Sequence, residues 1–129
     1  MNELRNAVNL ITVKDLPALF CNDEVWAATA LRCGDAVHDP MWRLPLWAGY
    51  DDWLKSPVAD LNNVASKPMA GSIIAGLYLQ RFVKLSIPWL HLDLYAWNDA
   101  TRPGRPEGGE AMTIRALLAA LKEQLTKPK

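Results

Sequence analysis

The chain contains one strictly alternating stretch, Pro88-Trp89-Leu90-His91-Leu92-Asp93-Leu94-Tyr95. Successive side chains of a β-strand point to opposite faces, so Leu90, Leu92 and Leu94 share one face. The aromatic, histidine and aspartate side chains share the other face. This pattern predicts a strand over residues 88–95 that has one apolar face to bury.

Three other segments have apolar residues at helical spacing. In the first, Asn22 and Asp23 offer N-cap oxygens to a helix over about residues 23–37. Residues 69–83 fit a nearly all-apolar helix, which we expect to be central and buried. Residues 110–125 carry apolar side chains at i, i+3, i+4 and i+7 spacing. They predict an amphipathic helix near the end of the chain.

The segments between these elements are short and punctuated by proline and glycine. Pro45 suits the first turn of a short amphipathic helix that runs to Leu54 and is stopped by Pro57. Residues 58–64 are too few for a confident helix and favour a short strand or extended segment. Residues 99–109 combine proline, glycine and polar residues, which predicts a surface loop.

Helices that alternate with short strands indicate an α/β fold, here a partial sheet flanked by helices. The chain has 129 residues, half of them apolar, which is enough for one packed domain. A sheet of two or three strands would expose its edges unless something else completed it. Six tryptophans further imply either a large aromatic core or a surface that another chain covers.

Charge and length exclude several classes of protein. Fourteen basic residues balance fourteen acidic ones without long runs of one sign, which argues against nucleic-acid or anionic-lipid binding. No apolar stretch reaches the roughly 20 residues that span a bilayer, and the first residues lack a secretion signal, so we expect a cytoplasmic location. Cys21 and Cys33 bracket the first helical pattern, which separates them by roughly 18 Å. This distance predicts two free thiols.

Three local clusters could carry chemistry. His91 and Asp93 share a strand face and could be metal ligands or a general-base pair; alternatively, they hydrogen-bond neighbouring backbone and orient the strand against the following helix. Cys33, His38 and Asp39 could bind a metal, and Cys33 with His38 could form a nucleophile pair, although His38 is better explained as the end of a helix. Arginines in the 99–109 loop could hold a phosphate, although their spacing matches no phosphate loop and favours a solvated loop.

A set of ordered motifs carries a resemblance to a known family. The motifs cover roughly residues 15–125: Asp15-Leu-Pro-Ala-Leu-Phe-Cys-Asn-Asp23, Asp39-Pro-Met-Trp-Arg-Leu-Pro-Leu46, Lys55-Ser-Pro-Val-Ala-Asp-Leu-Asn-Asn-Val64, Ala70-Gly-Ser-Ile-Ile-Ala75 with Leu79-Gln-Arg-Phe-Val83, and Trp89-Leu-His-Leu-Asp93. In this order they resemble the C-terminal part of the catalytic domain of leucyl aminopeptidases, also called cytosol aminopeptidases. The tail over residues 96–110 looks like a bacterial subgroup of that family.

The resemblance implies a fragment of an α/β/α catalytic domain, with a single domain over residues 15–129 and a divergent segment over residues 1–14. Complete members of the family remove N-terminal residues from peptides, using two divalent metals, zinc or manganese. The segments that carry their metal ligands and catalytic arginine precede the part that this chain resembles. We therefore assign no catalytic residue and no metal ligand, expect no cofactor in this chain, and expect it to be inactive by itself.

The resemblance also implies a place for substrate. The segment after the histidine-leucine-aspartate motif contributes to the wall of the family's side-chain pocket, which points to Tyr95, Ala96 and Asn98 as substrate-binding residues. This chain lacks the family's alanine-glycine step there, so Tyr95 and Trp97 should reshape the pocket, or these aromatics merely cap the strand. The expected partner is a second copy or a missing metal-binding half. The alternative function is a non-catalytic oligomerisation or interaction module.

Overall fold

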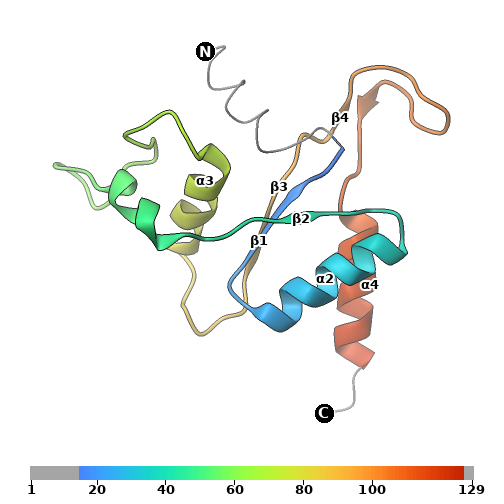
Figure 1. The fold of residues 1–129 in the computed structure, drawn as a ribbon, viewed down its shortest axis with the longest axis horizontal. Helices are drawn as coiled ribbons and strands as arrows, with labels where there is room; N and C mark the ends of the chain where they lie inside the picture. The colour runs from blue at the N-terminus through green and yellow to red at the C-terminus, as the bar shows by residue number, and fades with distance from the viewer. Residues whose placement is uncertain (1–14, 127–129) are drawn as a thin grey trace.

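The computed structural model of the chain describes residues 15–126 and contains a three-stranded mixed sheet with the strand order β2-β1-β3. The middle strand β1 (Ala18–Cys21) runs parallel to β2 (Trp42–Arg43) and antiparallel to β3 (Leu90–Asp93) (Figure 1). Leu19 lies opposite Leu92 in the antiparallel register, and Phe20 lies opposite His91. Alternation along β1 therefore gives the sheet two different faces, one on the side of Leu19 and one on the side of Phe20.

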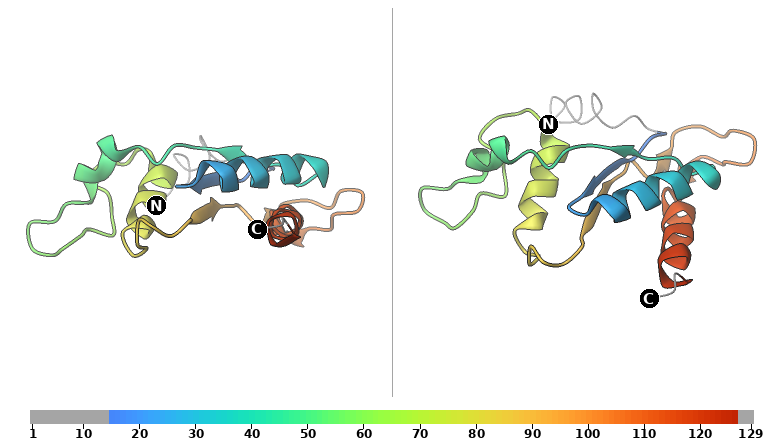
Figure 2. Two further views of the ribbon diagram at one scale, coloured as in Figure 1. Left: turned by 90° about the horizontal axis from the view of Figure 1, so that it is seen from below. Right: turned by 60° about the horizontal axis from the view of Figure 1, so that its bottom comes forward.

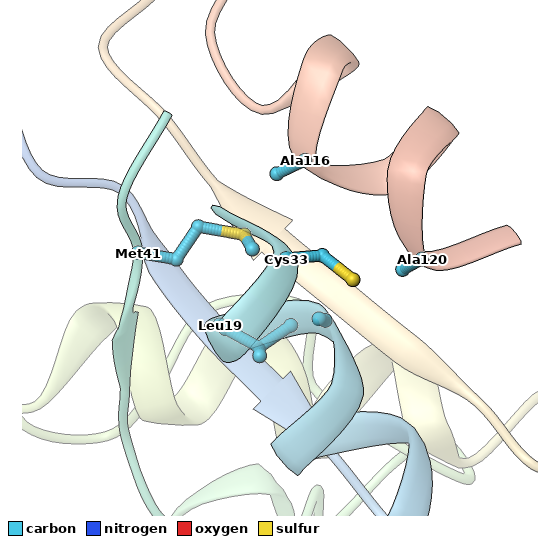
Figure 3. Close-up of a cluster of buried hydrophobic side chains, with 6 residues drawn as sticks. Leu19, Cys33, Met41, Ala116 and Ala120 are labelled. Carbon is cyan, nitrogen blue, oxygen red and sulfur yellow. The ribbon is translucent and has the colours of Figure 1, made fainter. Parts of the chain in front are cut away.

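Helices cover both of these faces. On the Leu19 side lie α2 (Glu24–Ala36) and α4 (Ile114–Thr126), whose buried residues form one cluster with the strand (Figure 3). On the opposite side, Ala18 and Phe20 pack against partly buried side chains that include Ile73 of α3 (Gly71–Gln80). The predicted α/β fold with a partial sheet flanked by helices is confirmed. The members of the first cluster are Leu19, Ala30, Cys33, Met41, Ala116 and Ala120.

The contact between α2 and α4 is made by small residues. Ala30 and Ala116 are fully buried, and a Cβ atom on Gly34 would lie 3.4 Å from the Cβ of Ala116. The same hypothetical atom would lie only 2.7 Å from the carbonyl oxygen of Asp39, a distance that real Cβ atoms do not tolerate. Gly34 is therefore required for the chain to turn back closely after α2.

Asp39 fixes the beginning of α4. Its carboxylate is buried and accepts hydrogen bonds from the backbone amides of Thr113, Arg115 and Ala116 at 3.0, 3.0 and 3.2 Å. These amides belong to the first turn of the helix, which has no intrahelical acceptors for them. The negative charge also opposes the positive end of the helix dipole. Asp39 therefore caps a helix that begins more than 70 residues later in the sequence.

The 99–109 segment is more ordered than a solvated loop. Its ends pair as a two-stranded ribbon of β4 (Trp97–Asn98) and β5 (Gly108–Gly109), and Arg102 forms an isolated bridge with Arg105. The residues between the two strands are exposed and project from the body of the molecule (Figures 1 and 2). The prediction of a surface location is confirmed, and the pairing adds a hairpin that the composition did not indicate.

Several element boundaries differ from prediction. Residues 58–64 form bends and no strand; the hydroxyl of Ser56 accepts from the amides of Val58 and Ala59 and so shapes this segment locally. The short helix after Pro45 is a 3₁₀ helix, η1 (Ala48–Leu54). The predicted strand over 88–95 is shortened to β3.

The helix predicted over 69–83 is confirmed as α3, but the expectation that it is central and buried is wrong. Ser72, Ile74 and Leu77 are buried, whereas Leu79 in its last turn and Phe82, two residues after its end, are exposed. Its buried face packs against η1 and the Phe20 side of the sheet, and the other face meets no described element. The predicted divergent segment over residues 1–14 lies outside the described residues. Across residues 15–126, no helix is both long and apolar enough to cross a bilayer.

We expect Asp39→Ala to lower the free energy of unfolding by roughly 1–3 kcal/mol, because it leaves buried amides of α4 without an acceptor. Asp52→Ala is the matched control, since it removes only an exposed ion pair with Lys55 and should have little effect. Urea denaturation followed by circular dichroism measures both. Equal stability of the two variants would show that the Asp39 cap is not important.

Candidate functional site

Of the residues predicted to bind substrate, Tyr95 and Ala96 lie in the connection between β3 and β4, and Asn98 is the last residue of β4. Tyr95 is 43% exposed, and its hydroxyl donates to the Asp99 carboxylate at 2.9 Å. Ala96 has a positive φ of 52°, which turns the chain sharply between the two strands. Asn98 is only 4% exposed. The structure thus places the three residues in one turn, with Tyr95 at the surface and Asn98 inside.

The side chain of Asn98 is occupied by the hairpin. Its amide nitrogen donates to the carbonyl oxygens of Arg105 and Pro106, both at 2.8 Å, and its oxygen accepts from Arg102 Nε at 3.1 Å. A buried amide with these three partners holds the 99–107 loop against β4. Asn98 therefore positions the loop, with both polar atoms of its side chain hydrogen-bonded to the hairpin.

The two loop arginines are engaged by carboxylates. Arg102 lies 3.0 Å from Asp15 and 3.7 Å from Glu110, and Arg105 forms a closer ion pair with Glu110. A phosphate would have to compete with these carboxylates, so the geometry does not favour the phosphate alternative. A shallow hollow beside the cluster is lined by Asp15, Trp97, Asn98, Asp99, Ala100 and Arg102. Trp97 and Asn98 from the predicted pocket segment border this hollow, whereas Tyr95 does not.

The side chains of His91 and Asp93 contact different elements. The His91 ring stacks between Phe20, with centroids 5.8 Å apart, and Trp89, with centroids 6.1 Å apart. Asp93 accepts a hydrogen bond from the buried Ser72 hydroxyl at 2.5 Å. Asp93 thus ties β3 to α3, the helix that precedes it, through a side chain. The expectation of backbone contacts toward the following helix is wrong.

Cys33, His38 and Asp39 likewise have different partners and do not form one site. The Cys33 thiol lies 3.6 Å from the Glu123 carboxylate, and Asp39 is used as a helix cap. His38 is exposed with a positive φ of 54° directly after α2, as expected for a residue that ends a helix. Both Cys21 and Cys33 are free thiols, as the helical separation predicted.

An aromatic array at η1 runs from the surface to the core, because Trp47 is exposed whereas Tyr50 and Trp53 are partly buried against Leu54, Ile74 and Leu77. Trp47 is 56% exposed and contacts Tyr50 edge-on at 4.6 Å; Tyr50 lies 4.3 Å from Trp53. The Lys67 ammonium sits 4.9 Å from the Trp53 ring, a cation–π contact. The alternative that some of the six tryptophans form a surface covered by another chain stays a prediction.

Comparison with known proteins gives the family of this chain. The fold is a mixed sheet with helices on both faces, and residues 3–118 match the cytosol aminopeptidase family, catalytic domain. The chain belongs to this family. The resemblance noted from the motifs is therefore confirmed.

The relatives are considerably longer than this chain. A probable cytosol aminopeptidase of Caulobacter vibrioides is 38% identical over 117 residues, which cover 88% of this chain and 23% of the relative. The crystal structure of the cytosol aminopeptidase from Coxiella burnetii is 47% identical with a TM-score of 0.87, covering 92% of this chain and 26% of that one. The bottromycin maturation enzyme BotP in complex with Mn is 33% identical, with a TM-score of 0.85, over 92% and 26% of the two chains. The chain thus spans about a quarter of the length of the proteins it matches.

The metals of such enzymes can be tested against the residues present here. Within residues 15–126, no group of three or more histidine, cysteine, aspartate or glutamate side chains is close enough to hold a metal ion. Two of the carboxylates, those of Asp39 and Asp93, accept hydrogen bonds from the first turn of α4 and from Ser72. The described residues therefore do not fit a two-metal site.

Protonation of His91 should destabilise the fold. Burial lowers the pKa of His91 below its ordinary value, and the Asp93 carboxylate opposes part of this effect. A histidine with a lowered pKa binds fewer protons when folded, so the free energy of unfolding should fall as the pH drops below about 6.5. His91→Phe keeps a stacking ring and should weaken this pH dependence. Urea titrations at about pH 7.5 and 5.5 measure the change.

His38→Asn serves as the control for this prediction, because it removes the other histidine of the chain at an exposed position that tolerates a left-handed conformation. Its pH dependence should match that of the unmodified chain. If His91→Phe loses as much stability over the same pH range as the unmodified chain, the effect arises from other groups.

Proposed function

We propose that this chain serves as the C-terminal part of an aminopeptidase catalytic domain, and that the complete unit removes N-terminal residues from peptides. The observation that carries the proposal is the match over residues 3–118 to the catalytic domain of this family, together with a TM-score of 0.87 to one of its solved enzymes. The metals, zinc or manganese, would be held by residues outside 15–126. These described residues would be inactive by themselves.

In this proposal the segment after β3 forms part of the wall around the substrate's N-terminal side chain. Tyr95 is the strongest candidate, because its ring is exposed and its hydroxyl is held by Asp99. Ala96 contributes the turn that brings this ring and Trp97 to the surface. Asn98 acts indirectly, since its polar atoms hold the 99–107 loop.

A second candidate function is a non-catalytic interaction module that keeps the assembly surfaces of the family. Three tryptophans favour it, because Trp42, Trp47 and Trp97 are 49%, 56% and 50% exposed. Large aromatic side chains at the surface are enriched where proteins associate. The two functions differ in the partner required: a second copy of this chain for the module, and a metal-binding polypeptide for the enzyme.

The first test is complementation. The chain is mixed or co-expressed with the part of the Coxiella burnetii enzyme that precedes its matching segment, in the presence of manganese or zinc. We expect hydrolysis of leucine anilide only when both polypeptides are present, because the chemistry needs metal ligands that residues 15–126 lack. Equal activity from this chain without its complement would contradict the proposal. Each polypeptide assayed separately is the control.

The second test concerns Tyr95. In the active combination, Tyr95→Ala should enlarge the pocket and alter kcat/KM among leucine, phenylalanine and alanine substrates by about 10- to 200-fold, the range expected for side-chain volume in a pocket. Trp42→Ala is the matched control, because it removes a half-exposed aromatic side chain on β2, away from the β3–β4 connection. An unchanged preference with Tyr95→Ala would remove this residue from the substrate site.

A further inference from the structure

The segment that follows β3 is held at both of its ends by side-chain hydrogen bonds. At the first end, Asp93 accepts from the hydroxyl of Ser72, which is 2% exposed, at 2.5 Å. At the second end, the buried side chain of Asn98 has three hydrogen-bond partners in the hairpin. A buried hydrogen bond keeps its geometry, because breaking it leaves polar atoms without partners. Residues 94–97 are therefore a short span between two fixed points.

The turn within this span depends on the hairpin. Ala96 has a φ of 52°, in the left-handed region that alanine adopts less readily than glycine. Its carbonyl oxygen accepts from the backbone amide of Glu110, directly after β5, at 3.0 Å. Such a backbone conformation persists only where its surroundings impose it. The directions in which Tyr95 and Trp97 leave the chain are therefore set by the hairpin.

Arg102 determines how the side chain of Asn98 is oriented. A guanidinium group donates hydrogen bonds and cannot accept them, so the Nε atom of Arg102, 3.1 Å away, requires the oxygen of the Asn98 amide. The amide nitrogen is then left to donate to the carbonyl oxygens of Arg105 and Pro106. Each polar atom of the Asn98 side chain thus has a partner of the right kind. A side chain without a donor at the position of Nε would leave the amide oxygen without this partner.

The same guanidinium is fixed by two other segments of the chain. Its Nη2 atom lies 3.0 Å from the carboxylate of Asp15, three residues before β1, and 3.7 Å from the carboxylate of Glu110. A planar guanidinium directs its donors along fixed directions, so holding Nη2 also holds Nε. Arg102 therefore connects Asn98 to the start of the central strand of the sheet.

Arg105 offers a comparison within the same hairpin. Its side chain is 43% exposed, against 44% for Arg102, and it also forms an ion pair with Glu110. Arg105 meets Asn98 through its backbone carbonyl, which any residue at this position would present. Substitution of the Arg105 side chain should therefore leave the orientation of Asn98 intact. The two arginines separate a general effect of charge in the hairpin from an effect that passes through Nε.

We propose that Arg102 is a positioning residue for substrate preference: through Asn98 it fixes the wall that Tyr95 and Trp97 form around the substrate's N-terminal side chain. Trp97, Asn98 and Arg102 border one shallow hollow, so a displacement of Arg102 also changes the surface beside this wall. The inference rests on the proposed function and names a residue that determines the preference of that site. A loosened wall would favour a bulky side chain such as that of phenylalanine.

The kinetic test compares Arg102→Lys with Arg105→Lys in the combination of this chain and the preceding part of the Coxiella burnetii enzyme. Lysine keeps the positive charge but carries no donor at the position of Nε. We expect Arg102→Lys to raise kcat/KM for phenylalanine anilide relative to leucine anilide by roughly 3- to 10-fold, the effect of one hydrogen bond. Arg105→Lys should leave this ratio unchanged. The ratio reports on the shape of the pocket, because a smaller folded fraction lowers both values equally.

A second measurement uses the purified chain and needs no activity. The side-chain amide of Asn98 gives its own proton signals in nitrogen–proton NMR spectra. Exchange of these protons with solvent should be slow while the amide nitrogen is bound to two carbonyl oxygens. Arg102→Lys should speed this exchange by roughly 3- to 10-fold, again the effect of one hydrogen bond. Arg105→Lys should leave the exchange unchanged.

The outcomes separate this inference from the proposed function. An equal ratio of phenylalanine to leucine hydrolysis in the unmodified and Arg102→Lys combinations would overturn the inference, as would an equal shift in both lysine variants. If the unmodified combination hydrolyses neither substrate, the proposed function fails, and exchange at Asn98 alone decides on Arg102. Faster exchange in Arg102→Lys would then support the positioning of Asn98, and unchanged exchange would reject it.

Discussion

The packing of this protein depends on the carboxylate of Asp39. It accepts hydrogen bonds from three amides at the start of α4, and the backbone amide of Asp39 donates to the carbonyl oxygen of Gly34 in α2 at 2.8 Å. The chain then enters the core at Met41 and pairs with β1 at Trp42. One buried charge thus joins two helices and the outermost parallel strand. The arrangement is possible because Gly34 has no side chain where the Asp39 carbonyl passes.

This long-range cap also explains which parts of the fold were predictable from sequence. The helix at 24–36 was predictable because its cap is local: the Asp23 carboxylate accepts from the Trp26 amide at 2.8 Å. The cap and the amide that it binds lie within four residues of sequence. The start of α4 was predicted at residue 110 and lies at 114, because its cap comes from a distant loop. β2 and the β4–β5 ribbon have two residues per strand, too few for any period to be visible.

In the candidate site, too, local features were predictable from the sequence and long-range contacts were not. The alternation around His91 correctly predicted β3, but the ring's position between Phe20 and Trp89 depends on register with β1, which periodicity does not encode. Asn98 was assigned to substrate, and in the fold its side chain holds the carbonyls of Arg105 and Pro106. A side chain that binds backbone leaves no pattern in the partner's sequence. Tyr95 could be singled out because an aromatic residue replaces a small one in the family motif.

The distribution of side-chain sizes indicates how this segment is stabilised. Small residues fill the interface between α2 and α4, and Phe20, Leu19 and Leu54 are the large apolar side chains that are almost completely buried. Leucines of α4 and Phe82 after α3 are instead exposed. Since burial of a large apolar side chain contributes about 1.5–3 kcal/mol, much of the available hydrophobic stabilisation is not realised within residues 15–126. The internal geometry of residues 15–126 is therefore set by caps, close glycine contacts and strand register, and the apolar side chains on the outer faces contribute little to it.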